Sequence, residues 1–219
     1  AWWPLDGKVK DYSGNGNHLK ISVGSPSITS GLGQSSYQFN EDGNGDELKS
    51  NKLDGVDPHR ITITAWINPN NSSDSRSPIF RGGGDVYFQH YSNNRLATYW
   101  YGWDDTGYHY STTNSVPTGS WSHVSVTWSS NGEINFYVNG NLDSTITGVG
   151  SGGDPATIDA LIGRENSNRR FDGKIQDVRI YDRALSQVEI ETLYNLTNND
   201  QRLIQTDNLH AKNQFSERL

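Results

Sequence analysis

The stretch DYSGNGNHL, which begins at Asp11, spaces oxygen-bearing side chains as a cation-binding loop would. Asp11, Ser13 and Asn15 fall at alternate positions ahead of Gly16. This is the opening spacing of a calcium loop that places side-chain oxygens at positions 1, 3 and 5 and glycine at position 6. The rest of that pattern fails, because position 12 is Ser22, which cannot supply a bidentate carboxylate. The stretch is therefore not an EF-hand; it is either a tight turn or a turn that holds a cation.

A second carboxylate stands out in the segment GKIQDVRIY. Asp177 shares a strand face with Ile175, whereas Ile180 lies in the opposite phase. Either a β-bulge shifts the phase, or the carboxylate points into an apolar layer. A buried carboxylate needs a partner, because an unpaired ion is very costly in a low dielectric. That partner is either a cation or a group of the chain itself, such as Arg179, Lys174 or backbone amides.

The segment YWYGWDDTGYHY concentrates aromatic residues around two aspartates. A sugar presents one apolar C–H face and a rim of hydroxyl groups, which a flat aromatic ring beside polar side chains complements. We expect Trp103 and Tyr108 to be exposed and to bind carbohydrate. Their polar partners would be Asp104, Asp105 and Arg81. The alternative is that aromatic residues of this segment fill a core, which we expect for some of them.

Patterns typical of catalysis are missing from the sequence. The E-x-D-x-x-E run of a sandwich glucanase, which supplies the two carboxylates that flank the scissile bond, does not occur. The R-x-E-L-R and Q-I-H segments of sandwich polysaccharide lyases are absent too. The six histidines form no H-E-x-x-H pair, and no G-x-S-x-G elbow occurs. We therefore expect that the chain is not an enzyme.

The composition of the chain further restricts its possible partners and location. The chain has 219 residues, no cysteine and a formal net charge of −7. Sequence-independent nucleic-acid binding depends on an excess of Lys and Arg, so we expect no nucleic-acid partner. No apolar run approaches the ~20 residues of a membrane-spanning helix, so we expect no membrane span. At this length a self-sufficient core is feasible without disulfides.

Short alternating runs separated by Gly, Asn, Asp and Ser dominate residues 2–181. In RITITAWIN, residues 61, 63, 65 and 67 are apolar and share one face. WSHVSVTW alternates in the same way, and EINFYVNGNL ends in Asn139-Gly140, a strong hairpin signal. The aromatic-rich runs DVYFQHY and RLATYWY are further candidate strands. Many short strands joined by turns predict an all-β protein, an antiparallel sandwich or jelly roll.

One helix is predicted near the end of the chain, in ALSQVEIETLYN. Ser186 and Glu189 form a capping box, and Leu185 and Ile190 are placed for a hydrophobic staple. We expect this helix to run to Tyr194 and the folded domain to span residues 1–194. Residues 195–219 are polar with no clean period, and we expect a tail that is either mobile or docks on a partner.

The segments WWPLDG, DYSGNGNHL, ITITAWINP, GSWSHVSVTWSSNGEINFYVNG and FDGKIQDVRIYDRALSQVEIETLYN follow one another as they do in laminin-G-like domains. The chain thus resembles this family of the concanavalin A-like superfamily over about residues 2–194. The resemblance implies a jelly-roll sandwich of two antiparallel sheets with one short C-terminal helix. It also implies an extracellular protein, glycan binding, and a structural calcium at Asp11, Asn17 and Asp177, where the first loop meets the last strand.

Together these features predict a non-catalytic, calcium-stabilised carbohydrate-binding (lectin-like) or adhesion module of a secreted, cell-surface or virion-surface assembly. Its partner would be a glycan or a glycoprotein. The alternative is a structural or interaction protein, such as a virion surface or decoration component, in which the tail at residues 195–219 contacts neighbouring subunits. The fold hosts both classes, so function has to be argued from the site.

Overall fold

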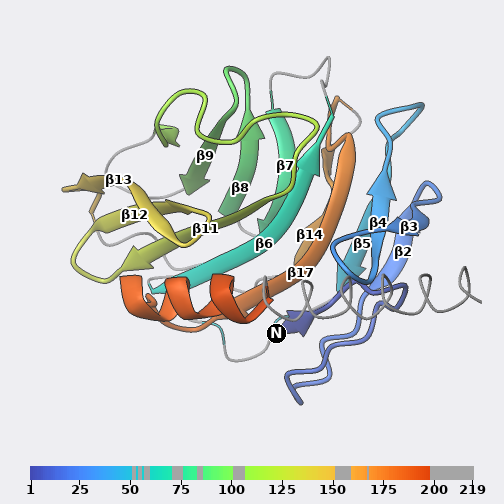
Figure 1. Ribbon diagram of the computed structural model, residues 1–219, viewed down its shortest axis with the longest axis horizontal. Helices are drawn as coiled ribbons and strands as arrows, with labels where there is room; N and C mark the ends of the chain where they lie inside the picture. Colours follow the sequence, from blue (N-terminus) through green and yellow to red (C-terminus); the bar gives the residue numbers. More distant parts are fainter. Residues whose placement is uncertain are drawn as a thin grey trace, which may run out of the picture.

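The computed structural model describes residues 1–50, 53, 56, 60–70, 76–82, 86–100, 107–150, 159–166 and 168–197. Within these residues the chain forms two large antiparallel sheets that pack face to face (Figure 1). The first sheet runs in the order β13 (Asn141–Thr147), β12 (Glu133–Val138), β11 (Ser122–Ser129), β6 (Ile61–Pro69), β17 (Gly173–Tyr181), β4 (Ser35–Phe39) and β3 (Ser27–Ser30), and β1 (Trp2–Trp3) pairs with β17.

The second sheet runs in the order β10 (His109–Tyr110), β9 (Arg95–Trp100), β8 (Val86–Tyr91), β7 (Arg76–Gly82), β14 (Ala160–Ile162), β5 (Glu47–Ser50) and β2 (Lys20–Val23). A small hairpin of β15 (Arg164–Asn166) and β16 (Arg169–Arg170) packs beside β7. All pairings are antiparallel between these strands, which confirms the predicted sandwich of two antiparallel sheets.

The core lies between the two sheets and follows the predicted alternation. On β6 the four residues of the apolar face are completely buried: Ile61, Ile63, Ala65 and Ile67. Trp128 of β11 meets Trp100 of β9 edge to face, with ring centroids 5.4 Å apart, so the two sheets contact each other through aromatic rings. Each large side chain buried in this way stabilises the fold by about 1.5–3 kcal/mol.

The turn between β12 and β13 forms as its dipeptide predicts. Asn139 and Gly140 both have positive φ, 51° and 80°. A two-residue hairpin loop with this backbone matches the right-handed twist of the strands, and Asn-Gly adopts it at low cost. Asn139 also accepts a hydrogen bond from the backbone N–H of His123, which ties the turn to β11.

The C-terminal helix spans residues 187–197 and lies against the outer face of the first sheet. Its capping box is present, because the Ser186 backbone N–H donates to Glu189 at 2.9 Å. The helix continues three residues beyond its predicted end, and the indole N–H of Trp66 donates to the Thr197 hydroxyl at 2.9 Å. The first three residues of the predicted tail are thus helical, and residues 198–219 lie outside the described part of the chain. In the part described, no helix is long and apolar enough to cross a membrane.

Candidate functional site

The outer face of the second sheet carries the main concentration of aromatic side chains that the core does not use. On β8, Val86 and Phe88 point into the core, so Tyr87, Gln89 and Tyr91 point outward. Tyr87 lies opposite Tyr99 of β9 in the register of the sheet. Successive side chains of a strand point to opposite faces of the sheet, so one row of aromatic residues faces the core and a second row faces outward.

We call Tyr87, Tyr91, Tyr99, Tyr108 and Tyr110 the tyrosine cluster. Its rings contact one another across three strands: Tyr99 and Tyr108 have centroids 5.0 Å apart, and Tyr91 and Tyr110 are 5.1 Å apart. Tyr108 and Tyr110 stack on each other at 6.2 Å. Burial raises the pKa of both Tyr108 and Tyr110, so their hydroxyl groups stay protonated at neutral pH.

Arginine side chains lie among these rings. Arg76 of β7 donates to the Tyr108 hydroxyl at 2.8 Å, and its guanidinium lies 5.1 Å from the Tyr108 ring centroid. Arg95 of β9 lies 3.9 Å from the ring centroid of Tyr110. Burial alone would lower the pKa of Arg76, but the Tyr108 hydroxyl raises it above its ordinary value. The guanidinium groups of both arginines are thus held by aromatic neighbours.

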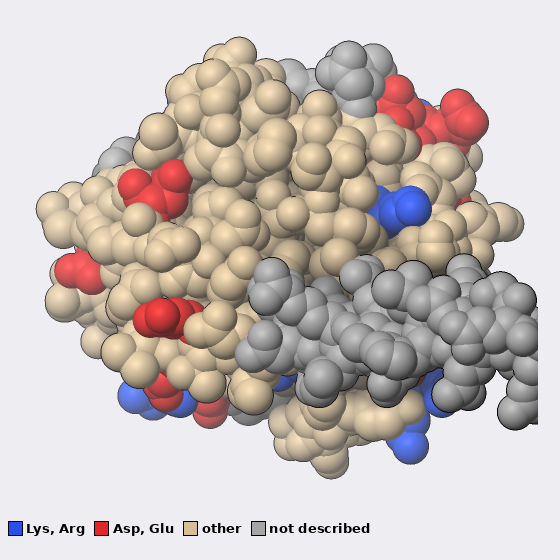
Figure 2. Space-filling model, viewed as in Figure 1, with Lys and Arg blue, Asp and Glu red and all other residues tan. Residues whose placement is uncertain are grey.

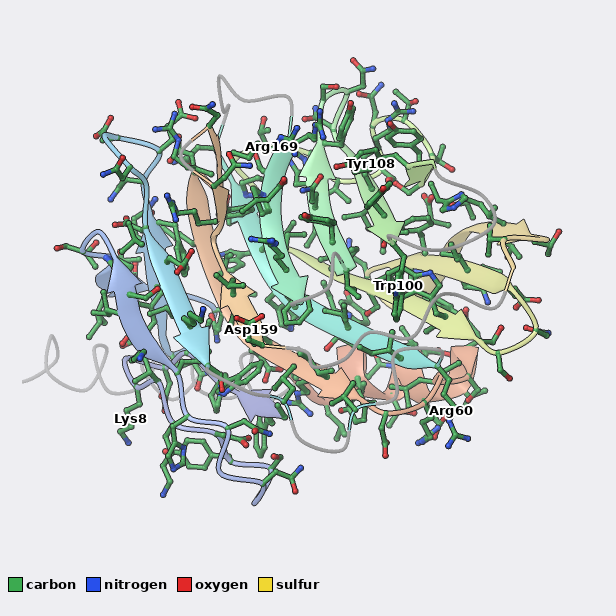
Figure 3. All side chains as sticks on the ribbon, turned by 180° about the vertical axis from the view of Figure 1, so that it is seen from behind. Lys8, Arg60, Trp100, Tyr108, Asp159 and Arg169 are labelled. Carbon is green, nitrogen blue, oxygen red and sulfur yellow. The ribbon has the colours of Figure 1, made fainter. Side chains whose placement is uncertain are left out.

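Glu165 from the β15–β16 hairpin is a buried carboxylate beside this face. Its carboxylate accepts a hydrogen bond of 3.0 Å from Gln89 and forms an ion pair with Arg169. Its backbone carbonyl accepts a hydrogen bond from Arg81 at 3.2 Å. Figure 3 shows Tyr108 and Arg169 at the same end of the sheet, near the ends of β7, β8 and β9. Glu165 thus anchors the hairpin to the sheet.

The structure brings two of the predicted carbohydrate-binding residues to this face. Tyr108 lies in the cluster, and Arg81 lies 5.6 Å from the ring of Tyr87. Trp103, Asp104 and Asp105 lie outside the described residues, so their placement stays a prediction. The other four tyrosines were not among the predicted carbohydrate-binding residues. Tyr99 and Tyr110 belong to the aromatic segment YWYGWDDTGYHY, and the aromatic residues of DVYFQHY were a usable signal for Tyr87 and Tyr91.

At the other end of the molecule, Asp177 lies at a β-bulge in β17, one of the two alternatives that the sequence left open. The register shifts between Gln176 and Arg179, and Asp177 has a φ of +52°. Its carboxylate accepts hydrogen bonds from Arg179 Nε and Nη2 at 3.0 Å each and from the indole N–H of Trp2 at 2.7 Å. Asp177 therefore has partners from the chain itself.

Asp11 is tied to the same tryptophan. Its carboxylate accepts four hydrogen bonds of 2.9 Å, from the backbone N–H groups of Trp2, Ser13 and Asn17 and from the Ser13 hydroxyl. Burial alone would raise the pKa of Asp11, but these donors lower it below its ordinary value. Trp2 thus joins the predicted ligands Asp11, Asn17 and Asp177 in one network, which we call the N-terminal clamp.

The donors of this clamp do not fit a shared calcium ion. A cation needs oxygen lone pairs that no hydrogen atom occupies, whereas both carboxylates of the clamp face N–H or O–H donors and Asp177 faces a guanidinium. Across the described residues, no group of three or more His, Cys, Asp or Glu side chains is placed to hold a metal. Calcium stays a prediction from the resemblance, and binding it would require Arg179 to leave Asp177.

The fold and this outer face define a jelly-roll sandwich that presents aromatic and cationic side chains on one sheet. The chain belongs to the concanavalin A-like lectin/glucanases superfamily, whose Laminin_G_3 family model matches residues 42–191. A comparison with curated proteins finds no match.

Solved structures of similar fold include binding domains of larger proteins. Domain 4 of AbnA, an extracellular arabinanase from Geobacillus stearothermophilus solved in complex with arabinotriose, matches with a TM-score of 0.72 and 18% identity over 89% of this chain and 97% of that one. The binding domain of Paraclostridial Mosquitocidal Protein 1 matches with a TM-score of 0.69 and 19% identity over 88% of this chain and 50% of that one. The binding domain of Botulinum Neurotoxin DC in complex with SialylT matches with a TM-score of 0.68 and 15% identity over 89% of this chain and 50% of that one. Because the sequence identities are this low, the similarity to these structures shows a shared fold and nothing more.

Proposed function

We propose that the chain is a non-catalytic carbohydrate-binding module and that glycan binds on the outer face of the second sheet. The observation that carries this proposal is the tyrosine cluster with Arg76 and Arg95 set among its rings. Tyrosine rings pack against the C–H face of a sugar, and guanidinium groups donate hydrogen bonds to the hydroxyl rim. The same surface therefore offers both kinds of contact that a sugar ring requires.

The relatives support carbohydrate as the ligand class. Domain 4 of AbnA was solved with arabinotriose, and the neurotoxin domain was solved with SialylT. AbnA is an extracellular enzyme, and its domain 4 is covered almost completely by this chain. We infer by analogy that this chain also acts outside the cell, as one binding module of an assembly.

The contacts of Glu165 support a non-catalytic role. Glycoside hydrolysis ordinarily uses two carboxyl groups that flank the bond, about 5–9.5 Å apart. The partners found for the Glu165 carboxylate are instead an arginine and amide groups, from Arg169, Gln89 and Asn166. The Glu165 carboxylate thus anchors the hairpin, and its described partners include no second carboxyl group.

A glycan array followed by titration calorimetry with the strongest array glycan tests the proposal. We expect Tyr110→Ala and Tyr99→Ala each to weaken binding about fivefold, since stacking on one aromatic ring contributes about 1 kcal/mol. Tyr12→Ala is the matched control, because Tyr12 is 41% exposed on the N-terminal loop, where it contacts Trp2. It should bind like the wild type.

Two results would overturn the proposal. One is an array on which the folded protein binds no glycan. The other is binding that Tyr12→Ala weakens as much as the two variants of the cluster do, since the glycan would then lie elsewhere.

A further inference from the structure

The register of the second sheet sets two arginines on either side of one tyrosine. Tyr91 of β8 lies opposite Arg76 on β7 and opposite Arg95 on β9. Neighbouring strands lie about 4.8 Å apart, so the backbones of the two arginines are about 10 Å apart across Tyr91. Two like charges thus lie side by side, in a chain whose formal net charge is −7.

Neither arginine of this row has a carboxylate partner among the residues that the structure describes. Arg76 bonds to the Tyr108 hydroxyl, and Arg95 lies over the rings of Tyr91 and Tyr110. The nearby carboxylate of Glu165 is taken by Arg169, a further cation beside the same face. Glu165 acts on Arg76 through its charge alone, so in the described part of the chain the direct contacts found for the two guanidinium groups are tyrosine rings and one hydroxyl group.

We propose that the face is selective for acidic glycans, those whose sugars carry a carboxylate or a sulfate group. This inference rests on the proposed glycan-binding function and adds the charge of the ligand to it. Both arginines are half-buried, and the Nε atom of Arg95 is buried and has no hydrogen-bond partner among the described residues. A partly desolvated cation gains most from an anionic partner, and the planar guanidinium fork matches the two oxygens of a carboxylate or a sulfate.

The tyrosine rings complete such a site. Tyr91 lies between the two arginines in the register of the sheet, and the rings of Tyr108 and Tyr110 lie beside it. A sugar ring stacked on these tyrosines would bring an acidic substituent within reach of Arg76 or Arg95. In the view of Figure 2, by contrast, lysine and arginine side chains are few and uncharged side chains fill the centre.

The test compares pairs of ligands that differ only in charge. Trigalacturonic acid is compared with its methyl ester, which removes the carboxylate charge. A heparin tetrasaccharide is compared with its desulfated, N-acetylated form, which removes the sulfate groups. Titration calorimetry is carried out on the full chain at 20 and 200 mM NaCl. We expect the charged member of at least one pair to bind about tenfold more tightly at low salt, with the difference shrinking at high salt. The pair that shows the difference identifies the acidic group.

Matched variants assign this preference to the row. Arg76→Gln and Arg95→Gln should each weaken binding of the charged member several-fold more than binding of the neutral member, and so remove most of the preference. Arg95→Lys keeps the charge and loses the fork, so it should retain part of the preference. Lys8→Gln is the control, because Lys8 is exposed and lies far from Tyr108 in Figure 3. Unchanged melting temperatures verify that the variants fold.

Equal affinity for charged and neutral members in both pairs would overturn the inference and leave the glycan-binding function in place. Equal loss of charged and neutral binding in the arginine variants would do the same, since the arginines would then only shape the face. A folded protein that binds none of the glycans, here and on the array, would overturn both proposals.

Discussion

The N-terminal clamp is held together either by contacts within the chain or by a bound calcium ion. Replacing Asp177 distinguishes these two possibilities. The residue is 5% exposed, and its carboxylate contacts the guanidinium of Arg179 and the indole of Trp2. The charge of Asp177 raises the pKa of Arg179, which burial alone would lower. Removing the carboxylate charge therefore leaves the largely buried Arg179 guanidinium without its anionic partner.

We predict that Asp177→Asn destabilises the protein by about 2–3 kcal/mol. Breaking a fully buried ion pair from one side costs about 3–5 kcal/mol, and we take less because the Arg179 side chain is 19% exposed. Asn also tolerates the positive φ of +52° at this position, so the variant isolates the charge. Asp177→Ala should cost about 1 kcal/mol more, because alanine is strained in this conformation.

Thermal and urea unfolding measure this effect. For a chain of this size, a loss of 2–3 kcal/mol lowers the melting temperature by about 5–10 °C. Combining Asp177→Asn with Arg179→Gln in a double-mutant cycle should give a coupling energy of at least about 1.5 kcal/mol. Glu191→Gln, which changes an exposed carboxylate on the C-terminal helix, is the control and should stay within about 0.5 kcal/mol.

Thermal unfolding with and without calcium tests whether Arg179, and not a calcium ion, is the partner of Asp177. If the clamp is complete as described, wild type should melt at the same temperature in EDTA and in about 5 mM calcium. A site with a dissociation constant of about 10⁻⁴ M would instead stabilise the folded state by roughly 2 kcal/mol at that concentration. A calcium-dependent rise that Asp177→Asn abolishes would mean that Asp177 binds an ion in place of Arg179.

Two further predictions concern pH. The pKa of Asp11 is lowered in the folded state, so its stabilisation is present at neutral pH and is lost as the pH falls below its ordinary value of 3.8. Asp11→Asn should cost about 2 kcal/mol at pH 7 in urea unfolding, and this cost should shrink as the pH falls below 3.8. A cost that does not change with pH would mean that the charge of Asp11 is irrelevant. Burial and then the charge of Arg179 lower the pKa of His123 from 6.5 to about 3, so below pH 6.5 the unfolded state takes up a proton that the folded state does not. Wild type should therefore lose about 2 kcal/mol more than His123→Phe between pH 7 and pH 5, and parallel pH profiles would contradict the burial of a neutral His123.

Short-range patterns in the sequence determined much of the fold. The alternation over residues 61–67 predicts which side chains of β6 enter the core, because a strand has a period of two whatever its partners are. Asn139-Gly140 predicts its own turn, because few other dipeptides accept two positive φ angles. The phase break at Asp177 indicated a bulge as one of two alternatives. Each of these features depends on residues that are close together in the sequence.

The tertiary structure alone decided the features that join distant segments. The last described turn of the helix contacts Trp66, more than a hundred positions earlier, whose indole N–H donates to the Thr197 hydroxyl. Trp2 links the first loop to the last long strand only because β1 pairs with β17. The row of Arg76, Tyr91 and Arg95 exists because three strands align in one register, and no single stretch of sequence contains it. Strand order and register depend on the packing of the whole core, so a site assembled across strands cannot be predicted from local pattern.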